Sequence, residues 1–307
     1  MTRNISKLDL QELMGNEESC IQFLFEERLL KTNKNCSMCN KPMSIQKCSD
    51  RKYPYLQCKQ GHTKVTISCA SGTWFEKTKL SPIQVMLLTH CFAVNNTYKQ
   101  TITDASVGNS KLSKTTVSDW FSFCREVCMI SMCNKITNSK IGGPGHIVEI
   151  DECKIGRRKY NRVRLVEGNW ILGMIDRNTR EVRMAVCPGN RRDATTLYDL
   201  VSQHVEPTST IYTDCWKGYN GLLAGGFSEH LTVNHSENFV DQRTGAHTNT
   251  IEAQWRTLRR TLARGGIRQK NIDVHLCEFL WRKDCNSRNA DPFQQLIEDI
   301  REIYPVD

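Results

Sequence analysis

Three acidic side chains, those of Asp151, Asp214 and Glu252, lie where carboxylates could act together. Asp151 ends the β-rich run HIVEID, Asp214 nearly ends STIYTDC, and Glu252 falls in the first turn or so of an expected helix. Such a cluster persists only where a cation offsets the repulsion, and hard ions such as Mg²⁺ prefer carboxylate oxygens. Two ions about 3.5–4 Å apart can activate a water or a 3′-hydroxyl for phosphodiester cleavage. The acids therefore suggest a nuclease or strand-transfer centre, although a single acid is more often a surface or turn residue.

The segments that carry these acids predict a mixed α/β domain. Five strands are expected, at 146–151, 162–176, 181–187, 209–215 and 230–235, with helices at 193–205 and 249–264. If the first and fourth strands are neighbours, the carboxylates of Asp151 and Asp214 converge, and the last helix can supply Glu252. Three strands, a helix, two strands and a helix describe a mixed sheet flanked by helices.

The helix at 249–264 has a face for the core and a face for a ligand. At 3.6 residues per turn, one buried stripe is expected from Ile251, Trp255, Leu258 and Leu262. Glu252 falls at the edge of this stripe. The helix could therefore place an acid at a metal and basic side chains on the adjoining DNA backbone, namely Arg256, Arg259 and Arg260. Asn249, three residues before Glu252, could cap the helix or act as an outer ligand.

Upstream of this domain the composition changes. Residues 1–75 combine a helical lead-in with a segment rich in Cys, Lys, Ser and Thr, and residues 76–140 read as helical, with Ser81-Pro82 as a helix start. IGGPG at 141–145 cannot continue a helix and marks a boundary. We therefore expect domains at 1–75, 76–140 and 145–285, followed by a helical tail at 286–307.

A second group of possible metal ligands lies near the N-terminus. Cys36 and Cys39 have the Cys-x-x-Cys spacing that lets two thiolates share one tetrahedral Zn²⁺. Cys58 and His62 would complete a zinc-ribbon-like site that stabilises a segment poor in core residues. Substitutes for the fourth ligand are Cys48 and Cys69, and the alternative is that Cys36 and Cys39 are free thiols. Fifteen cysteines without a recognisable signal peptide favour a reduced intracellular compartment over a disulfide scaffold.

Charge distribution points to nucleic acid. The formal net charge is +9, and two stretches, 154–164 and 253–270, are rich in Lys and Arg and contain no acid. Clusters of this kind are expected of a phosphate-binding surface, although either stretch could be a solvated face. The first stretch holds the candidate contacts Arg157, Arg158 and Lys159. We expect no membrane partner, since no run of about 18 apolar residues occurs.

Three longer stretches carry a more specific pattern: VEIDECKIGRRKYNR…VEGNWILGMIDR, IYTDCWKGYNGL and LTVNHSENFVDQRTGAHTNTIEAQWRTLR. Their order and context over 145–285 resemble the Merlin family of DNA transposons and its bacterial insertion-sequence relatives. The resemblance implies a ribonuclease-H-like catalytic domain with an Asp-Asp-Glu triad at Asp151, Asp214 and Glu252 that uses Mg²⁺ or Mn²⁺. Some bacterial relatives carry Asn in the third role, which keeps Asn249 as an alternative.

The resemblance extends upstream. SGTWFEKTKL (71–80) looks like the family's link after a zinc ribbon, and KLSKTTVSDWFSFCREVC (111–128) resembles its helix-turn-helix-like segment. The recognition helix would open with Lys114, Thr115, Thr116 and Ser118, where bases and phosphates are reached. The partner expected is double-stranded DNA, as transposon ends and target, with a homodimer or larger assembly in the nucleus.

The sequence thus predicts a cut-and-paste transposase that binds terminal inverted repeats through residues 1–140. One alternative is a domesticated, catalytically silent, sequence-specific DNA-binding protein. Another is a ribonuclease-H-like nuclease that acts in repair.

Overall fold

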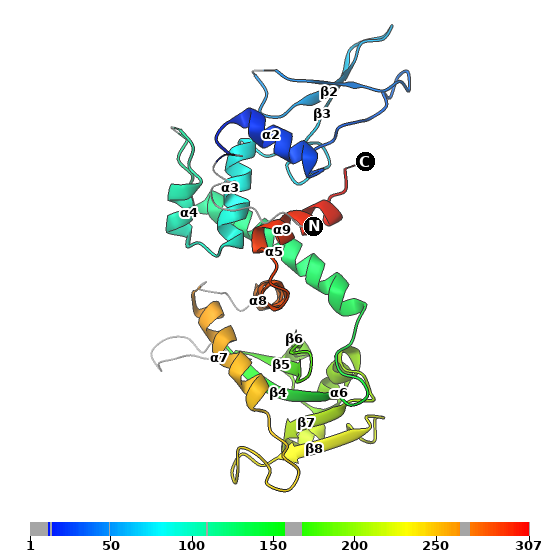
Figure 1. Ribbon diagram of the computed structural model, residues 1–307, viewed down its shortest axis with the longest axis vertical. Coiled ribbons are helices and arrows are strands. Elements are labelled where there is room, and N and C mark those ends of the chain that lie inside the picture. The colour runs from blue at the N-terminus through cyan, green and yellow to red at the C-terminus, as the bar shows by residue number, and fades with distance from the viewer. Residues whose placement is uncertain are drawn as a thin grey trace. The chain divides into compact units, whose positions relative to one another are not determined.

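Two units can be told apart in the chain, and each is described by itself. Unit 1 comprises Met1–Ser131 with Cys285–Asp307, and unit 2 comprises Met132–Asp284. The computed structural model describes residues 12, 14–48, 50–108, 110–156, 168–264 and 271–306. Figure 1 labels the helices and strands within both units.

Unit 2 is built on a five-stranded mixed sheet in the order β6-β5-β4-β7-β8. The strands are β4 (Ile147–Ile155), β5 (Asn169–Asp176), β6 (Val182–Val186), β7 (Thr210–Asp214) and β8 (Glu229–Val233). β5 pairs antiparallel with both β4 and β6. β7 is parallel to β4, and β8 is parallel to β7. The first strand of unit 2, β4, is therefore central, and this topology is that of a ribonuclease-H-like fold.

The two faces of β4 contact different helices (Figure 1). Val148 and Ile150 belong to a core cluster with Leu197 and Val201 of α6 (Ala194–His204). The alternate β4 side chains face α7 (Asn249–Arg264), which packs against β4 and β5. Two 3₁₀ turns, η1 (Pro188–Asn190) and η2 (Lys217–Tyr219), complete this part of the unit.

Close packing of α7 on the sheet depends on one glycine. The buried stripe expected for this helix is confirmed, because Ile251, Trp255, Leu258 and Leu262 are all buried. Gly173 of β5 pairs with Asp151, and a Cβ at Gly173 would lie only 2.4 Å from the Trp255 ring. Glycine therefore lets the indole lie against the sheet directly beside Asp151.

Unit 1 combines a small antiparallel sheet with helices. The sheet contains β1 (Ser44–Gln46), β2 (Tyr55–Cys58) and β3 (Val65–Ser68) in that order. The helices are α2 (Glu17–Glu26), α3 (Pro82–Ala93), α4 (Tyr98–Asp104) and α9 (Pro292–Ile303), together with the first part of α5 (Lys114–Thr137). α8 (Ile272–Ser287) ends in this unit and begins in unit 2.

The local sequence explains where α3 and α5 begin. The Ser81 hydroxyl accepts a hydrogen bond from the Gln84 amide, and the Gln84 side-chain oxygen accepts one from the Ser81 amide. Pro82 occupies the first turn, as the Ser-Pro signal predicts. Ser113 accepts a hydrogen bond from the Thr116 amide at 3.0 Å and so starts α5 where the recognition helix was expected. Within the described ranges, no helix has the length and apolar character of a membrane span.

One placement expected from the sequence is wrong. Asp151 is the fifth residue of β4, not near its end, because the strand continues through Ile155, which pairs with Asn169 of β5. The polar residues Glu152 and Lys154 suggested that the strand ends at Asp151, but a strand can carry polar side chains where it is half exposed. The rest of the expected element order in unit 2 is confirmed, while 162–167 of the expected second strand lies outside the described residues.

Candidate active site and metal-binding groups

Asp151 and Asp214 are brought together by the parallel pairing of β4 and β7. The described register runs from Ile147↔Thr210 to Glu149↔Tyr212, so each aspartate lies two residues beyond the last pair. Asp214 is the last residue of β7, where its side chain reaches past the sheet. One carboxylate oxygen from each of Asp151, Asp214 and Glu152 lies within 4.8 Å of the others, which is a group that could hold a metal ion.

The Asp151 carboxylate is held in place by two donors. Trp255 donates its indole N–H to Asp151 Oδ2 at 2.8 Å, and the Glu152 amide donates to Oδ1 at 2.8 Å. Burial raises the pKa of Asp151 to about 6; the two hydrogen bonds lower it, and repulsion by Asp214 and Glu252 raises it further. A carboxylate held this way is oriented but has no countercharge from the residues that the structure describes, and a cation would supply one.

Glu152 is the member of the group that sequence reasoning missed. Its neighbour Asp151 faces α7, and strict alternation along β4 would send Glu152 to the opposite face. Burial raises the pKa of Glu152 to about 7 and repulsion from Asp214 and Asp151 adds to the rise, while the Tyr219 hydroxyl and the charge of Arg192 lower it. Its Oε1 atom is buried with no hydrogen-bond partner among the described residues. The signal available in the sequence was the Asp-Glu doublet itself, which supplies two carboxylates at one point of the strand.

Glu252 lies beside this group and has partners of its own. Thr248 donates its hydroxyl to Glu252 Oε1 at 3.1 Å, and His235 Nε2 lies 3.3 Å from the same oxygen. The Glu252 side chain is 42% exposed, and it is close enough to raise the pKa of Asp151. The structure therefore gathers Asp151 and Asp214 with Glu152 and holds Glu252 at the rim through His235 and Thr248.

A buried acid, Glu149, anchors the start of α7. Its carboxylate accepts hydrogen bonds from the Thr250 amide at 2.8 Å, the Ile251 amide at 3.0 Å and the Thr250 hydroxyl at 2.7 Å. Arg177 Nε and His247 Nδ1 each lie 3.4 Å from Glu149 Oε1. Glu149 thus supplies the cap that we had considered for Asn249, which is the exposed first residue of α7.

The residues expected to contact DNA differ in exposure and in their contacts. Arg256 and Arg260 are exposed on α7, whereas Arg259 is exposed but donates to Cys153 Sγ of β4 at 2.8 Å. In unit 1, Lys114 and Thr115 are exposed at the start of α5, and Thr116 is half-buried. The other three candidates, Arg157, Arg158 and Lys159, lie outside the described residues.

The second group of possible ligands, in unit 1, is formed by Cys36, Cys39, Cys58 and His62, whose ligand atoms all lie within 4.8 Å of one another. His62 Nε2 lies 3.4 Å from Cys36 Sγ, 3.3 Å from Cys39 Sγ and 3.5 Å from Cys58 Sγ. The two sulfurs of Cys39 and Cys58 are 3.6 Å apart and are not bonded as a disulfide.

Hydrogen bonds orient these ligands. His62 Nδ1 lies 2.7 Å from the Thr63 carbonyl oxygen, which places the ring proton on Nδ1 and leaves Nε2 free for a metal. The Met38 amide donates to Cys36 Sγ, and the Lys41 backbone lowers the pKa of Cys39. The substitutes considered from sequence, Cys48 and Cys69, are not members of this group.

Unit 2 combines a ribonuclease-H-like sheet with a carboxylate cluster on the adjacent strands β4 and β7. This combination is typical of enzymes that cleave or join nucleic acid with bound metal ions. Residues 142–284 match the ISXO2-like transposase domain family. An uncharacterised transposase-like protein of Haemophilus influenzae is 32% identical over 88 residues, which are 28% of this chain and 69% of that protein. The chain therefore belongs to a family of transposases.

Similar folds are also found among solved structures. The catalytic core of HTLV-2 integrase in complex with magnesium is 12% identical, with a TM-score of 0.29, over 45% of this chain and 84% of that one. The catalytic core of BIV integrase is 15% identical, with a TM-score of 0.30, over 52% of this chain and 98% of that one.

Proposed function

We propose that this protein is a DNA transposase of the Merlin type, which cleaves and joins DNA at the ends of its own element. The observation that carries the proposal is the meeting of Asp151 and Asp214 on adjacent parallel strands in a chain of the transposase family. Glu252 is the third member of the proposed triad, and Glu152 is added to it as a further carboxylate.

The donor set fits Mg²⁺ or Mn²⁺. All its atoms are hard carboxylate oxygens, and the buried Oε1 of Glu152 has no donor among the described residues. A bound ion would polarise the scissile phosphate and activate the attacking hydroxyl. The chain's own contribution is orientation: Trp255 fixes Asp151, while His235 and Thr248 hold Glu252 beside it.

The cysteine group of unit 1 fits structural Zn²⁺. A tetrahedral zinc with bonds of about 2.0–2.3 Å would separate its ligand atoms by about 3.5–3.8 Å. The four sulfur–nitrogen and sulfur–sulfur distances, from 3.3 to 3.6 Å, are close to these edges. Zinc would stabilise the turn that carries Cys36 and Cys39 against the β2–β3 hairpin.

DNA contacts are proposed for the exposed basic side chains. On α7, Arg256 and Arg260 lie one to two turns after Glu252 and would follow the phosphate backbone leaving the site. In unit 1, the start of α5 would read the transposon ends through Lys114, Thr115 and Thr116. Paired ends imply a homodimer or larger assembly, and we propose the nucleus as the site of action.

Strand transfer tests the function. Purified protein should join a pre-cleaved element end to target DNA in the presence of Mg²⁺ or Mn²⁺, and Asp214→Asn should abolish joining while leaving end binding nearly unchanged. The matched control is Asp199→Asn, an exposed aspartate on α6 of the same unit, which should retain activity. Full activity of Asp214→Ala would sink the assignment. Specific end binding without metal-dependent nicking would instead identify a domesticated DNA-binding protein, and equal cleavage of random duplex a repair nuclease.

A further inference from the structure

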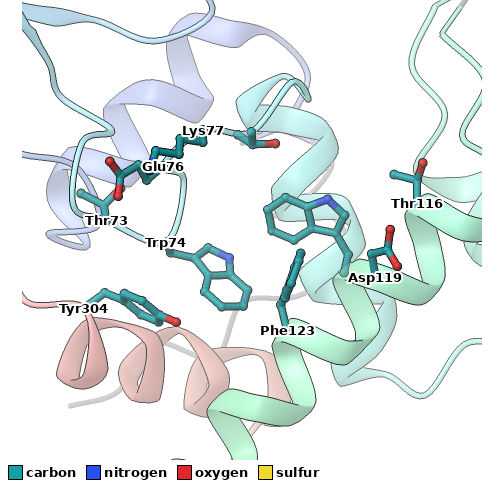
Figure 2. A pocket seen from close by; sticks show the side chains of 10 residues that line it. Thr73, Trp74, Glu76, Lys77, Thr116, Asp119, Phe123 and Tyr304 are labelled. Atoms are coloured by element: carbon teal, nitrogen blue, oxygen red, sulfur yellow. The ribbon is translucent and has the colours of Figure 1, made fainter.

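Unit 1 contains a pocket of about 480 Å³ that includes none of the candidate metal ligands, and Thr116 lies at its α5 side. Its aromatic walls come from three parts of the unit: Trp74 from the segment after β3, Trp120 and Phe123 from α5, and Tyr304 from the residues after α9 (Figure 2). Figure 2 shows Trp74 between Tyr304 and Phe123, with Asp119 on the α5 side.

Three of the ring planes in this pocket are nearly perpendicular to one another, and Tyr304 is tilted at 59° to Trp74. Trp74 lies at 75° to Trp120 and 87° to Phe123, and Trp120 lies at 86° to Phe123. The three centroid separations are 5.7, 6.5 and 5.7 Å, and Tyr304 lies 5.6 Å from Trp74. Three such planes form a corner, and aromatic faces attract a cation that approaches within about 6 Å of their centroids.

The charged side chains of the pocket also favour a cation. Glu76 and Asp119 line it and are exposed, and neither has an ion-pair partner among the residues that the structure describes. Among the described residues of the lining, Lys77 is the single basic one, so two carboxylates face one ammonium in a chain of net charge +9. A phosphate backbone would be repelled here, whereas a positively charged group would be attracted.

Two further features favour the binding of a ligand in this pocket. Trp74 Nε1 is buried and has no hydrogen-bond acceptor within the described part of the chain, which is costly for a buried donor. A backbone carbonyl of a bound peptide would satisfy it. Phe123 is 45% exposed, a large apolar surface that a ligand with a methylated head would cover.

We propose that this pocket binds a trimethylated lysine side chain carried by a basic peptide. A trimethylammonium group has no N–H donors and therefore loses less hydration on leaving water than an unmodified ammonium does, and the aromatic faces attract its charge. Glu76 and Asp119 attract the peptide's positive charge, and Trp74 Nε1 binds its backbone. The site contains none of the candidate metal ligands, and of the proposed DNA contacts it contains Thr116.

Binding to the full-length protein tests the proposal by isothermal titration with three basic peptides of one sequence. Their central side chain is trimethyl-lysine, unmodified lysine, or the neutral isostere in which carbon replaces the quaternary nitrogen. Trimethyl-lysine should bind about ten-fold more tightly than either of the other two, equivalent to about 1.4 kcal/mol. Equal affinity for the neutral isostere would overturn the proposal, as would the absence of binding by the trimethylated peptide.

Variants locate the binding. Phe123→Ala should weaken trimethyl-lysine binding at least ten-fold, and Asp119→Asn about three-fold, with the smaller effect lost at high salt. The matched controls, Phe239→Ala, which removes another exposed aromatic, and Glu17→Gln, an exposed acid of unit 1, should leave it unchanged. Circular dichroism checks that each variant folds. Tighter binding of single-stranded oligonucleotide, lost in Phe123→Ala, would show a nucleobase pocket and contradict the proposal.

Discussion

The anchoring of α7 by Glu149 can be tested by replacing this buried acid with glutamine. The carboxylate accepts three hydrogen bonds at the start of the helix that carries Glu252, and it faces Arg177 and His247. Glutamine keeps one acceptor oxygen but turns an amide toward the two basic side chains. Hydrogen bonds to charged groups contribute about 1.5–3 kcal/mol each, so we expect a loss of about 2 kcal/mol in unfolding free energy.

This loss has a measurable size. A change of about 2 kcal/mol corresponds to about 4–8 °C in the melting temperature of a unit of this length. Glu149→Ala would remove all three hydrogen bonds and leave the Thr250 and Ile251 amides buried without acceptors. The unfolding free energy would fall by about 3–5 kcal/mol, enough to unfold a large fraction of the molecules of a marginally stable unit. Glutamine is therefore the informative replacement.

The assay must separate positioning from stability. Glu149→Gln should reduce strand transfer at a temperature where the variant is folded, and it should raise the Mg²⁺ concentration that gives half-maximal activity, because Glu252 is displaced with the helix. Thr250→Val, which loses only the hydroxyl bond, should show a smaller effect in the same direction. The exposed control Asp199→Asn should change neither quantity. A Glu149→Gln variant with unchanged melting temperature and unchanged metal dependence would refute the reasoning.

Three other predictions concern the two metal groups. Trp255→Phe removes the N–H bound to Asp151 and should lower strand transfer about ten-fold, with end binding measured by gel shift nearly unchanged; loss of binding as well would point to unfolding. Mg²⁺ affinity measured by calorimetry should weaken as the pH falls from 8 to 5.5. Below their raised pKa values, about 6 for Asp151 and about 7 for Glu152, these carboxylates bind protons that compete with the ion. A Mg²⁺ affinity that does not change over this pH range would contradict the prediction. Purified protein should contain one zinc per chain by atomic absorption, and Cys39→Ser should lose it and melt at lower temperature, whereas Cys48→Ser should keep both.

The element order of unit 2 follows from sequence because runs of apolar and β-branched residues, bounded by turn residues, mark each strand. The same pattern does not predict which side chains surround Asp151 and Asp214 or which contacts hold α7 in place. Glu149 reads as one polar residue in an apolar run, and only the three-dimensional pairing of β4 with α7 shows that it binds helix amides. The sequence analysis does not single out Glu152, and alternation along β4 would separate it from Asp151; the structure nevertheless brings both carboxylates together with Asp214 at the end of β7. The contact of His235 with Glu252 joins the turn after β8 to the first turn of α7, which no local pattern relates.

A simple periodicity nevertheless links β4 to α7. On the strand, the residues that meet the helix are two apart, namely Glu149, Asp151 and Cys153. On the helix, their partners are four apart, namely Ile251, Trp255 and Arg259.

The two spacings match in length. Two strand residues rise about 6.6 Å and four helix residues about 6.0 Å, so the pairs stay in step over their whole length. Because the cap at Glu149 fixes the first pair, it also fixes where Trp255 meets Asp151. Glu252, one residue after Ile251, is then held at the edge of the contact, facing the carboxylates. The motif Glu-x-Asp-x-Cys on a central strand, followed by Ile-x-x-x-Trp-x-x-x-Arg on a later helix, is therefore a sequence signal for this geometry.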